Sequence, residues 1–189
     1  LKQRAYVLQQ WQGFRDGREI PPETIKRLNQ LAGKYRVEAE FSAGTNFFRQ
    51  LLIHVDKIPV ELALIQAAKE SAWGTSRFAQ QGNNLFGQWC FTEGCGIVPA
   101  RRPPGKSHEV QVFPNVRAAV ESYMRNLNSH PGYETLRTIR AGLRGKGETI
   151  TGFALAGGLR HYSAQGMDYV SSIRAMIRQN DVGQGNRGT

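Results

Sequence analysis

Glu70 is the residue of this sequence whose type and position most directly suggest catalysis. It closes the run Lys57-Ile-Pro-Val-Glu-Leu-Ala-Leu-Ile-Gln-Ala-Ala-Lys-Glu70, which is mostly apolar. Apolar residues around so much of the helical circumference predict a buried helix, and Gln66 and Glu70, four residues apart, share one face of it. Because burial disfavours the charged form of a carboxylic acid, Glu70 could stay protonated near neutral pH and act as a general acid. The alternative is a carboxylate that only caps a solvated helix end.

Cys90 and Cys95 are the two cysteines of the chain and enclose Phe-Thr-Glu-Gly. A tight turn can bring two such residues within bridging distance, so we predict a disulfide. A disulfide would indicate an oxidising compartment such as a periplasm. The alternative, a zinc site, would need further ligands, and the four histidines have no metal-like spacing to this pair. We therefore expect no metal.

Helices should carry most of the chain, with one small β-lobe between them. Apolar periodicity and helix-start signals predict helices at 1–11, with an interruption at Gly13, and then near 22–32, 47–55, 59–70, 116–127, 131–142, 150–156 and 167–177. The region from about 84 to 113 is rich in aromatic residues and glycine, and strands are predicted at 83–91, 96–100 and 107–113. The fold class is therefore mainly α, within α+β.

The chain has 189 residues, with 25 Lys and Arg against 15 Asp and Glu and a net charge of +10. We divide it into a helical lead-in at 1–44, a main domain at 45–180 and a disordered tail at 181–189. The charge favours a polyanionic partner, such as nucleic acid, anionic lipid or a cell-wall polymer. No nucleic-acid-binding motif accompanies it, and no apolar stretch is long enough to cross a bilayer, so we expect neither nucleic acid nor a membrane span. The first residues are not a secretion signal, so any export signal is expected outside this chain.

Two motifs relate the chain to a known family. Glu70-Ser-Ala-Trp-Gly74 and Asn84-Leu-Phe-Gly87, followed by Val112-Phe113 and a helix with Ala118 and Tyr123, resemble the glucosaminidase domain of glycoside hydrolase family 73. The resemblance covers roughly residues 45–180, and the two motifs together are more specific than either one. Gln88-Trp-Cys-Phe91 and Asn126-Leu-Asn-Ser-His-Pro131 are similar to the Bax branch of that family in Gram-negative bacteria.

The resemblance implies a lysozyme-like helical domain with an antiparallel β-lobe, which needs no cofactor. It also implies cleavage of the β-1,4 bond after N-acetylglucosamine in peptidoglycan. The family's general acid is the Glu before Ser-x-Trp-Gly, which is Glu70 here and would protonate the leaving glycosidic oxygen.

The second catalytic carboxylate is harder to assign, because many members carry it in a Thr-Glu-rich strand where this chain has Val98-Pro-Ala-Arg-Arg102. We predict that Glu109 activates the water, with Glu93 or the substrate's own acetamido group as alternatives.

Five residues are predicted to contact the substrate: Gln66, Asn84, Phe86, Trp89 and Tyr162. Tyr162 resembles the first Tyr of the family's Tyr-Ala-x-Asp-x-x-Tyr segment, which lines the active site. For Asn84 and Phe86 the alternative is a turn residue beside a core aromatic ring. For Trp89 the alternative is a buried ring in the β-lobe.

The predicted function is that of a peptidoglycan hydrolase of the periplasm or cell envelope, with glycan strands as its partner. A lytic transglycosylase on the same fold is one alternative, although Asn84-Leu-Phe-Gly87 stands in place of the Gly-Leu-Met-Gln-type segment usual in those enzymes. A non-catalytic cell-wall binder or scaffold is another. Retention or inversion, endo or exo action and the oligomeric state stay open.

Overall fold

The computed structural model describes residues 2–100 and 102–180, and the chain is mainly helical with one small antiparallel sheet. The predicted fold class is confirmed. Packing divides the described chain into two compact units, residues 2–59 with 125–170 and residues 60–124 with 171–180. The first unit contains the predicted lead-in and part of the predicted glucosaminidase domain. The predicted boundary between residues 1–44 and 45–180 therefore stays a prediction. The predicted tail at 181–189 lies outside the described residues.

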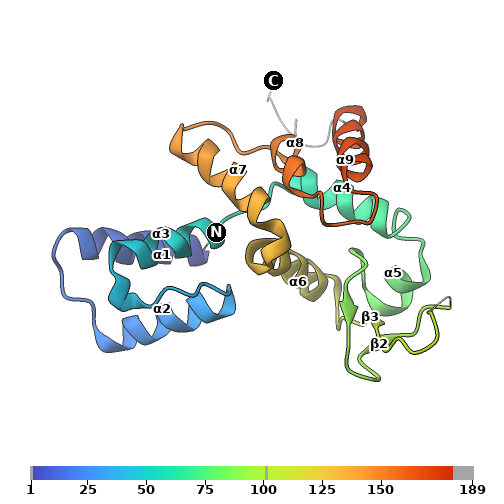
Figure 1. Ribbon diagram of the computed structural model, residues 1–189, viewed down its shortest axis with the longest axis horizontal. Helices are drawn as coiled ribbons and strands as arrows, with labels where there is room; N and C mark the ends of the chain where they lie inside the picture. The colour runs from blue at the N-terminus through green and yellow to red at the C-terminus, as the bar shows by residue number, and fades with distance from the viewer. Residues whose placement is uncertain (1, 101, 181–189) are drawn as a thin grey trace. The chain divides into compact units, whose positions relative to one another are not determined.

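The first unit is helical. Its members are α1 (Lys2–Arg15), α2 (Pro22–Lys34), α3 (Thr45–His54), α7 (Glu134–Gly145) and α8 (Gly152–Leu155), with 3-10 turns at Phe41–Ala43, Pro131–Tyr133 and Ala156–Gly158 (Figure 1). Helix α3 packs against both α1 and α7. Val7, Leu28, Phe47, Phe48 and Leu51 are fully buried, so the core of this unit joins α1, α2 and α3.

Helix α1 is longer than predicted. It passes through Gly13 and ends at Arg15, so the predicted interruption is wrong. The ring of Phe14 packs against those of Trp11, Phe41 and Phe48. This packing outweighs the roughly 1 kcal/mol that a glycine costs inside a helix.

The helix predicted at 150–156 is also different. Within this range the α-helix is limited to α8, which continues as the 3-10 turn Ala156–Gly158. A Cβ on Gly158 would lie 2.3 Å from the Cα of Leu136 in α7. The chain therefore needs a glycine where this turn meets α7.

Asp56 is a buried carboxylate of the first unit, with a side chain that is 3% exposed. Its carboxylate accepts hydrogen bonds from the guanidinium of Arg144 and from the N–H of Lys57 at 2.7 Å, and it lies 3.3 Å from Nη1 of Arg4. Burial alone would raise the pKa of Asp56. The hydrogen bonds from Arg144 and Lys57, with the charges of Arg140 and Arg4, instead hold this pKa below its usual value.

The second unit contains the sheet, α4 (Val60–Glu70), α5 (Arg77–Gly82) and the parts of α6 (Val116–Ser129) and α9 (Met167–Gln179) within its bounds. The strands are β1 (Trp89–Cys90), β2 (Gly96–Ile97) and β3 (Glu109–Gln111), antiparallel in the order β1-β3-β2 (Figure 1). Cys90 pairs with Glu109, and Ile97 pairs with Val110. The three strands lie where they were predicted and are shorter. No helix in the described part of the chain has the length and apolar character to cross a membrane.

Replacing Asp56 with Asn should lower the free energy of unfolding by about 3 kcal/mol, because the surrounding arginines lose their shared counter-ion. The difference should depend on pH. The folded pKa of Asp56 lies below its unfolded value of about 4, so its stabilisation is complete above that pH and is lost as the pH falls through the folded pKa.

Urea unfolding of both proteins at neutral and acidic pH measures this effect. The matched control is Asp16→Asn, which removes the exposed Asp16–Arg18 pair and should cost about 0.5 kcal/mol or less. A difference between wild type and Asp56→Asn that stays constant into strong acid would contradict the prediction.

Candidate active site

Glu70 is the last residue of α4, and its side chain is half-buried. The helix starts directly after Pro59 and buries Leu62, Ile65 and Gln66. Gln66 and Glu70 lie about one turn apart, so both project from the same side of α4. The carboxylate thus stands at a helix end, as the sequence predicts.

A short left-handed turn ends α4 just after Glu70. Ala72, Trp73 and Gly74 have φ values of 51°, 57° and 81°. This conformation costs roughly 1–2 kcal/mol for a residue with a Cβ, so Ala72 and Trp73 require compensating interactions. One is the N–H of Trp73, which donates to the carbonyl of Ala68 at 2.8 Å.

Ser71 provides the side-chain part of that compensation. It is 2% exposed, its hydroxyl donates to the carbonyl of Ala67 at 2.6 Å, and it accepts the N–H of Gly74 at 2.7 Å. The hydroxyl therefore ties the last turn of α4 to the left-handed residues. In physical terms, the Glu-Ser-x-Trp-Gly motif is a helix stop that leaves Glu70 at the terminus.

Asn84 shapes the loop after α5. Its Nδ2 donates to the carbonyls of Gln88 and Gln111 at 2.8 Å each, and its Oδ1 accepts the N–H groups of Phe86 at 3.3 Å and Gln88 at 3.0 Å. Asn84 is only 2% exposed. These bonds match the turn alternative for Asn84, and its contact with substrate stays a prediction.

Gly87 brings this loop beside Glu70. A Cβ built on Gly87 would lie 3.8 Å from Oε2 of Glu70. The φ of Gly87 is 63°, in the region that favours glycine. The Glu-Ser-x-Trp-Gly and Asn-Leu-Phe-Gly motifs therefore meet in the second unit, at the carboxylate.

Phe86, Tyr123 and Gln66 connect the loop, α6 and α4. The rings of Phe86 and Tyr123 stack with centroids 4.0 Å apart, and the Tyr123 hydroxyl donates to Oε1 of Gln66 at 2.7 Å. Phe86 is 3% exposed and Gln66 is fully buried. Their substrate contacts stay predictions, while their packing holds the three segments of the site together. Tyr123 is a supporting residue that sequence reasoning did not place at the site.

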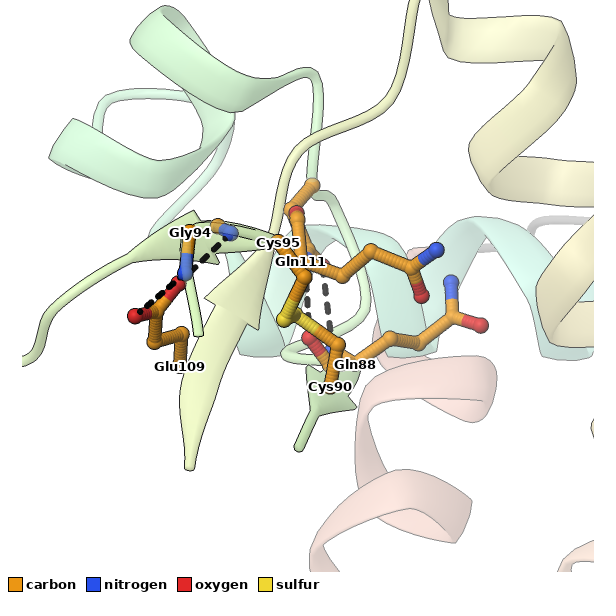
Figure 2. Close-up of a disulfide and its surroundings, with 8 residues drawn as sticks. Gln88, Cys90, Gly94, Cys95, Glu109 and Gln111 are labelled. Atoms are coloured by element: carbon orange, nitrogen blue, oxygen red, sulfur yellow. Dashed lines mark hydrogen bonds between the residues drawn. A yellow bond between two sulfur atoms is a disulfide. The ribbon is translucent and has the colours of Figure 1, made fainter. Parts of the chain in front are cut away.

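Cys90 and Cys95 form the predicted disulfide (Figure 2). Their sulfur atoms lie within 4.8 Å of a carboxylate oxygen of Glu109. Because a disulfide sulfur is not a thiolate, this group does not offer the ligands that the zinc alternative requires.

Glu109 is bound to the disulfide loop. One carboxylate oxygen accepts the N–H of Gly94 at 3.1 Å (Figure 2). The other accepts the N–H of Gly96 at 2.8 Å. These N–H groups hold the pKa of Glu109 below its usual value, so the group is ionised at neutral pH. A carboxylate held in this way is a weaker proton acceptor, and the catalytic role of Glu109 stays a prediction. Glu93, in the same loop, is exposed.

Exposed aromatic side chains lie on the same unit. Trp89 is 57% exposed and stacks on His108 with centroids 4.4 Å apart, so the buried alternative for Trp89 is wrong. Phe91, two residues further, and Trp73, in the turn after Glu70, are also exposed. An exposed aromatic ring can stack on a pyranose ring. Phe91 and Trp73 therefore join Trp89 as candidate sugar contacts, and the alternation Trp-Cys-Phe was the sequence signal for Phe91.

Tyr162 belongs to the first unit. Its ring stacks on Tyr169 with centroids 5.3 Å apart and lies 6.0 Å from the ring of Tyr133. The structure thus places Tyr162 in a row of three aromatic rings. Its role beside a glycan stays a prediction.

Comparisons with known proteins agree with the motifs. The family model described as Glucosaminidase: Mannosyl-glycoprotein endo-beta-N-acetylglucosaminidase matches residues 46–182. Protein bax of Escherichia coli (strain K12) is 34% identical over 174 residues, which are 92% of this chain and 60% of that protein. The chain therefore spans less than two thirds of the length of this relative. No solved structure matches the chain.

Replacing Gly87 with Ala should impair the site more than the fold. The left-handed φ should cost about 1 kcal/mol of stability, and the new methyl group would lie against Oε2 of Glu70. The matched control is Gly147→Ala, because Gly147 has a φ of 70° and open space around its Cβ position. Thermal unfolding should show similar losses for the two variants, whereas hydrolysis of purified peptidoglycan should fall only for Gly87→Ala. Equal activity in the two variants would show that Gly87 has no specific effect on hydrolysis.

Proposed function

Since the chain belongs to the glucosaminidase family, a family of glycoside hydrolases, we propose that it cleaves the β-1,4 bond after N-acetylglucosamine in peptidoglycan. The observation that carries the proposal is the meeting of two motifs at one carboxylate, with Gly87 against Oε2 of Glu70. Glu70 would be the general acid. It would deliver its proton to the glycosidic oxygen, since an alkoxide is a poor leaving group at neutral pH.

The position of Glu70 on α4 supports this role. The C-terminal end of a helix carries partial negative charge from its free carbonyl groups. Glu70 is the last residue of α4 and is half-buried, so its carboxyl group stands at the helix end beside Gly87. Gly87 adds no side chain beside the carboxylate.

Glu109 is the second carboxylate of the proposal. Its bonds to Gly94 and Gly96 support a positioning role in the disulfide loop, and they weaken it as an acceptor of a proton from water. Glu93 is exposed in that loop and is one alternative base. The acetamido group of the substrate is the other, and it would leave Glu70 as the single essential carboxylate.

We place the activity in the periplasm or cell envelope. The Cys90–Cys95 disulfide supports an oxidising compartment. Peptidoglycan lies outside the cytoplasm, and a net charge of +10 favours a polymer whose peptide stems carry carboxylates.

A lytic transglycosylase is the second candidate. The engagement of both Glu109 oxygens favours it, because such an enzyme needs one helix-end glutamate and uses no activated water. Mass spectrometry of the released muropeptides separates the two reactions. Reducing N-acetylglucosamine ends support the hydrolase, and anhydro-muramic ends support the transglycosylase.

Glu70→Gln is the direct test of the general acid. The substitution keeps the shape of the side chain and removes the transferable proton, so turnover of purified peptidoglycan should fall by about 10²- to 10⁴-fold. Glu121→Gln is the matched control, since Glu121 is exposed on α6 of the same unit. Unchanged turnover in Glu70→Gln would exclude Glu70 from the mechanism. Absence of turnover in the unaltered protein, with binding to peptidoglycan retained, would leave a cell-wall binder as the function.

Glu109→Gln and Glu93→Gln, compared under the same conditions, identify the second group. If Glu109 activates water, turnover should fall about as far as it does in Glu70→Gln, with substrate binding retained. If Glu109 only positions the loop, turnover should fall less and the thermal midpoint should drop, because the N–H groups of Gly94 and Gly96 lose an ionised acceptor. Full activity in both variants would favour assistance by the acetamido group.

A further inference from the structure

The first unit contains a cavity of about 290 Å³ between α1, α3 and α7. The charged residues that line it are Arg4, Arg49, Arg140 and Arg144, together with one acidic residue, Asp56. The four cations exceed the single anion by three charges. Such a lining repels cations and attracts an anionic ligand.

Three of these arginines share Asp56. Arg144 donates to its carboxylate, Nη1 of Arg4 lies 3.3 Å from Oδ2, and Nε of Arg140 lies 3.8 Å from the same oxygen. One unit of negative charge is thus divided among three guanidinium groups. Arg49 is exposed at the same cavity and, among the described residues, has no hydrogen bond or ion pair.

The positive charge persists at neutral pH. Arg140 is 1% exposed, and burial, together with the neighbouring arginines, lowers its pKa to about 10 against the opposing effect of Asp56. Arg140 also donates to the carbonyls of Ile53 and Lys57 and to Oδ1 of Asn128, which fixes its guanidinium in place. The charge of Arg140 is therefore held in place by the fold, whereas the exposed side chain of Arg49 can move to meet a ligand.

The remaining walls are apolar or weakly polar. Trp11, Leu52 and Ile53 are half-buried and line the cavity, while Thr45 adds a hydroxyl. A guanidinium suits carboxylate and phosphate oxygens because its N–H donors form a planar fork. The lining thus combines recognition of an oxyanion with a surface for a small apolar group.

We propose that this cavity binds a small organic oxyanion, with its carboxylate or phosphate on Arg49 and Arg144 and its apolar part against Trp11 and Leu52. The site involves no residue of the second unit and stands apart from glycoside hydrolysis. A peptide stem of peptidoglycan would supply the carboxylate, and a phosphate ester would supply the phosphate.

Nuclear magnetic resonance titration of the full chain tests the site. The probes are D-alanyl-D-alanine, its C-terminal amide and inorganic phosphate, and the reporter is the indole N–H signal of Trp11. The dipeptide or phosphate should shift this signal in a saturable manner that weakens as salt is added. The amide, which lacks the carboxylate, should not. A stronger response to the dipeptide identifies a carboxylate ligand, and a stronger response to phosphate identifies a phosphate ligand.

Arg49→Gln should weaken binding of the active probe about tenfold, the value of one charge-assisted hydrogen bond. Arg117→Gln is the matched control, because Arg117 is exposed on α6 and its loss lowers the net charge equally. Equal weakening in the two variants would reduce the effect to net charge and overturn the site. So would a Trp11 signal that responds to none of the probes, or that responds equally to the dipeptide and its amide. Loss of hydrolysis in Glu70→Gln bears only on the proposed function, since this titration measures no turnover.

Discussion

The helix stop after Glu70 is the constraint on which the candidate site depends. Helix α4 would bury Glu70 within a longer helix if it continued, and the left-handed residues 72–74 prevent this. Their conformation is costly for Ala72 and Trp73, and the bonds of Ser71 to Ala67 and Gly74 compensate for it. Backbone strain is therefore concentrated beside Glu70, the carboxylate at which the two motifs meet. That concentration is typical of functional sites, where the surrounding structure must enforce an unfavourable conformation.

The loop that faces Glu70 depends on interactions that are almost entirely internal. Asn84 fills its hydrogen-bonding capacity with backbone groups, and Phe86 anchors the loop on Tyr123, which in turn donates to Gln66 of α4. A buried polar network in which every member is satisfied is rigid, because any movement leaves a donor or acceptor without a partner. Most of the motif residues thus position Gly87 and Glu70, and few of them are available to touch a glycan. We propose that exposed rings such as Trp89 and Phe91 contact the substrate instead.

Local sequence signals predicted the parts of the fold that depend on interactions between residues close in sequence. Apolar periodicity located the helices, glycine and proline located the loops, and the short spacing of Cys90 and Cys95 predicted their bond. The errors came from tertiary contacts. Gly13 remains helical because aromatic rings pack around the next turn.

In the candidate site, too, the features that the sequence did not predict depend on tertiary contacts. Side-chain type indicated Glu109 as a carboxylate of interest, but its acceptance of two loop N–H groups depends on a turn whose backbone direction the sequence does not reveal. The bond between Arg144 and Asp56 joins residues 88 positions apart, which no local pattern can predict.

The second unit holds its two carboxylates of interest in different structural surroundings. Glu109 receives two backbone N–H groups, which favour its charged form and lower its pKa. Glu70 is the last residue of α4 and lies beside the backbone of Gly87. Pairs of acids separated in this way are suited to different roles, one as a proton donor and one as a fixed anion. In the proposed mechanism, an anion that holds the disulfide loop need not accept a proton from water to matter for catalysis. It would keep the β-lobe in one shape while Glu70, the proposed general acid, transfers its proton.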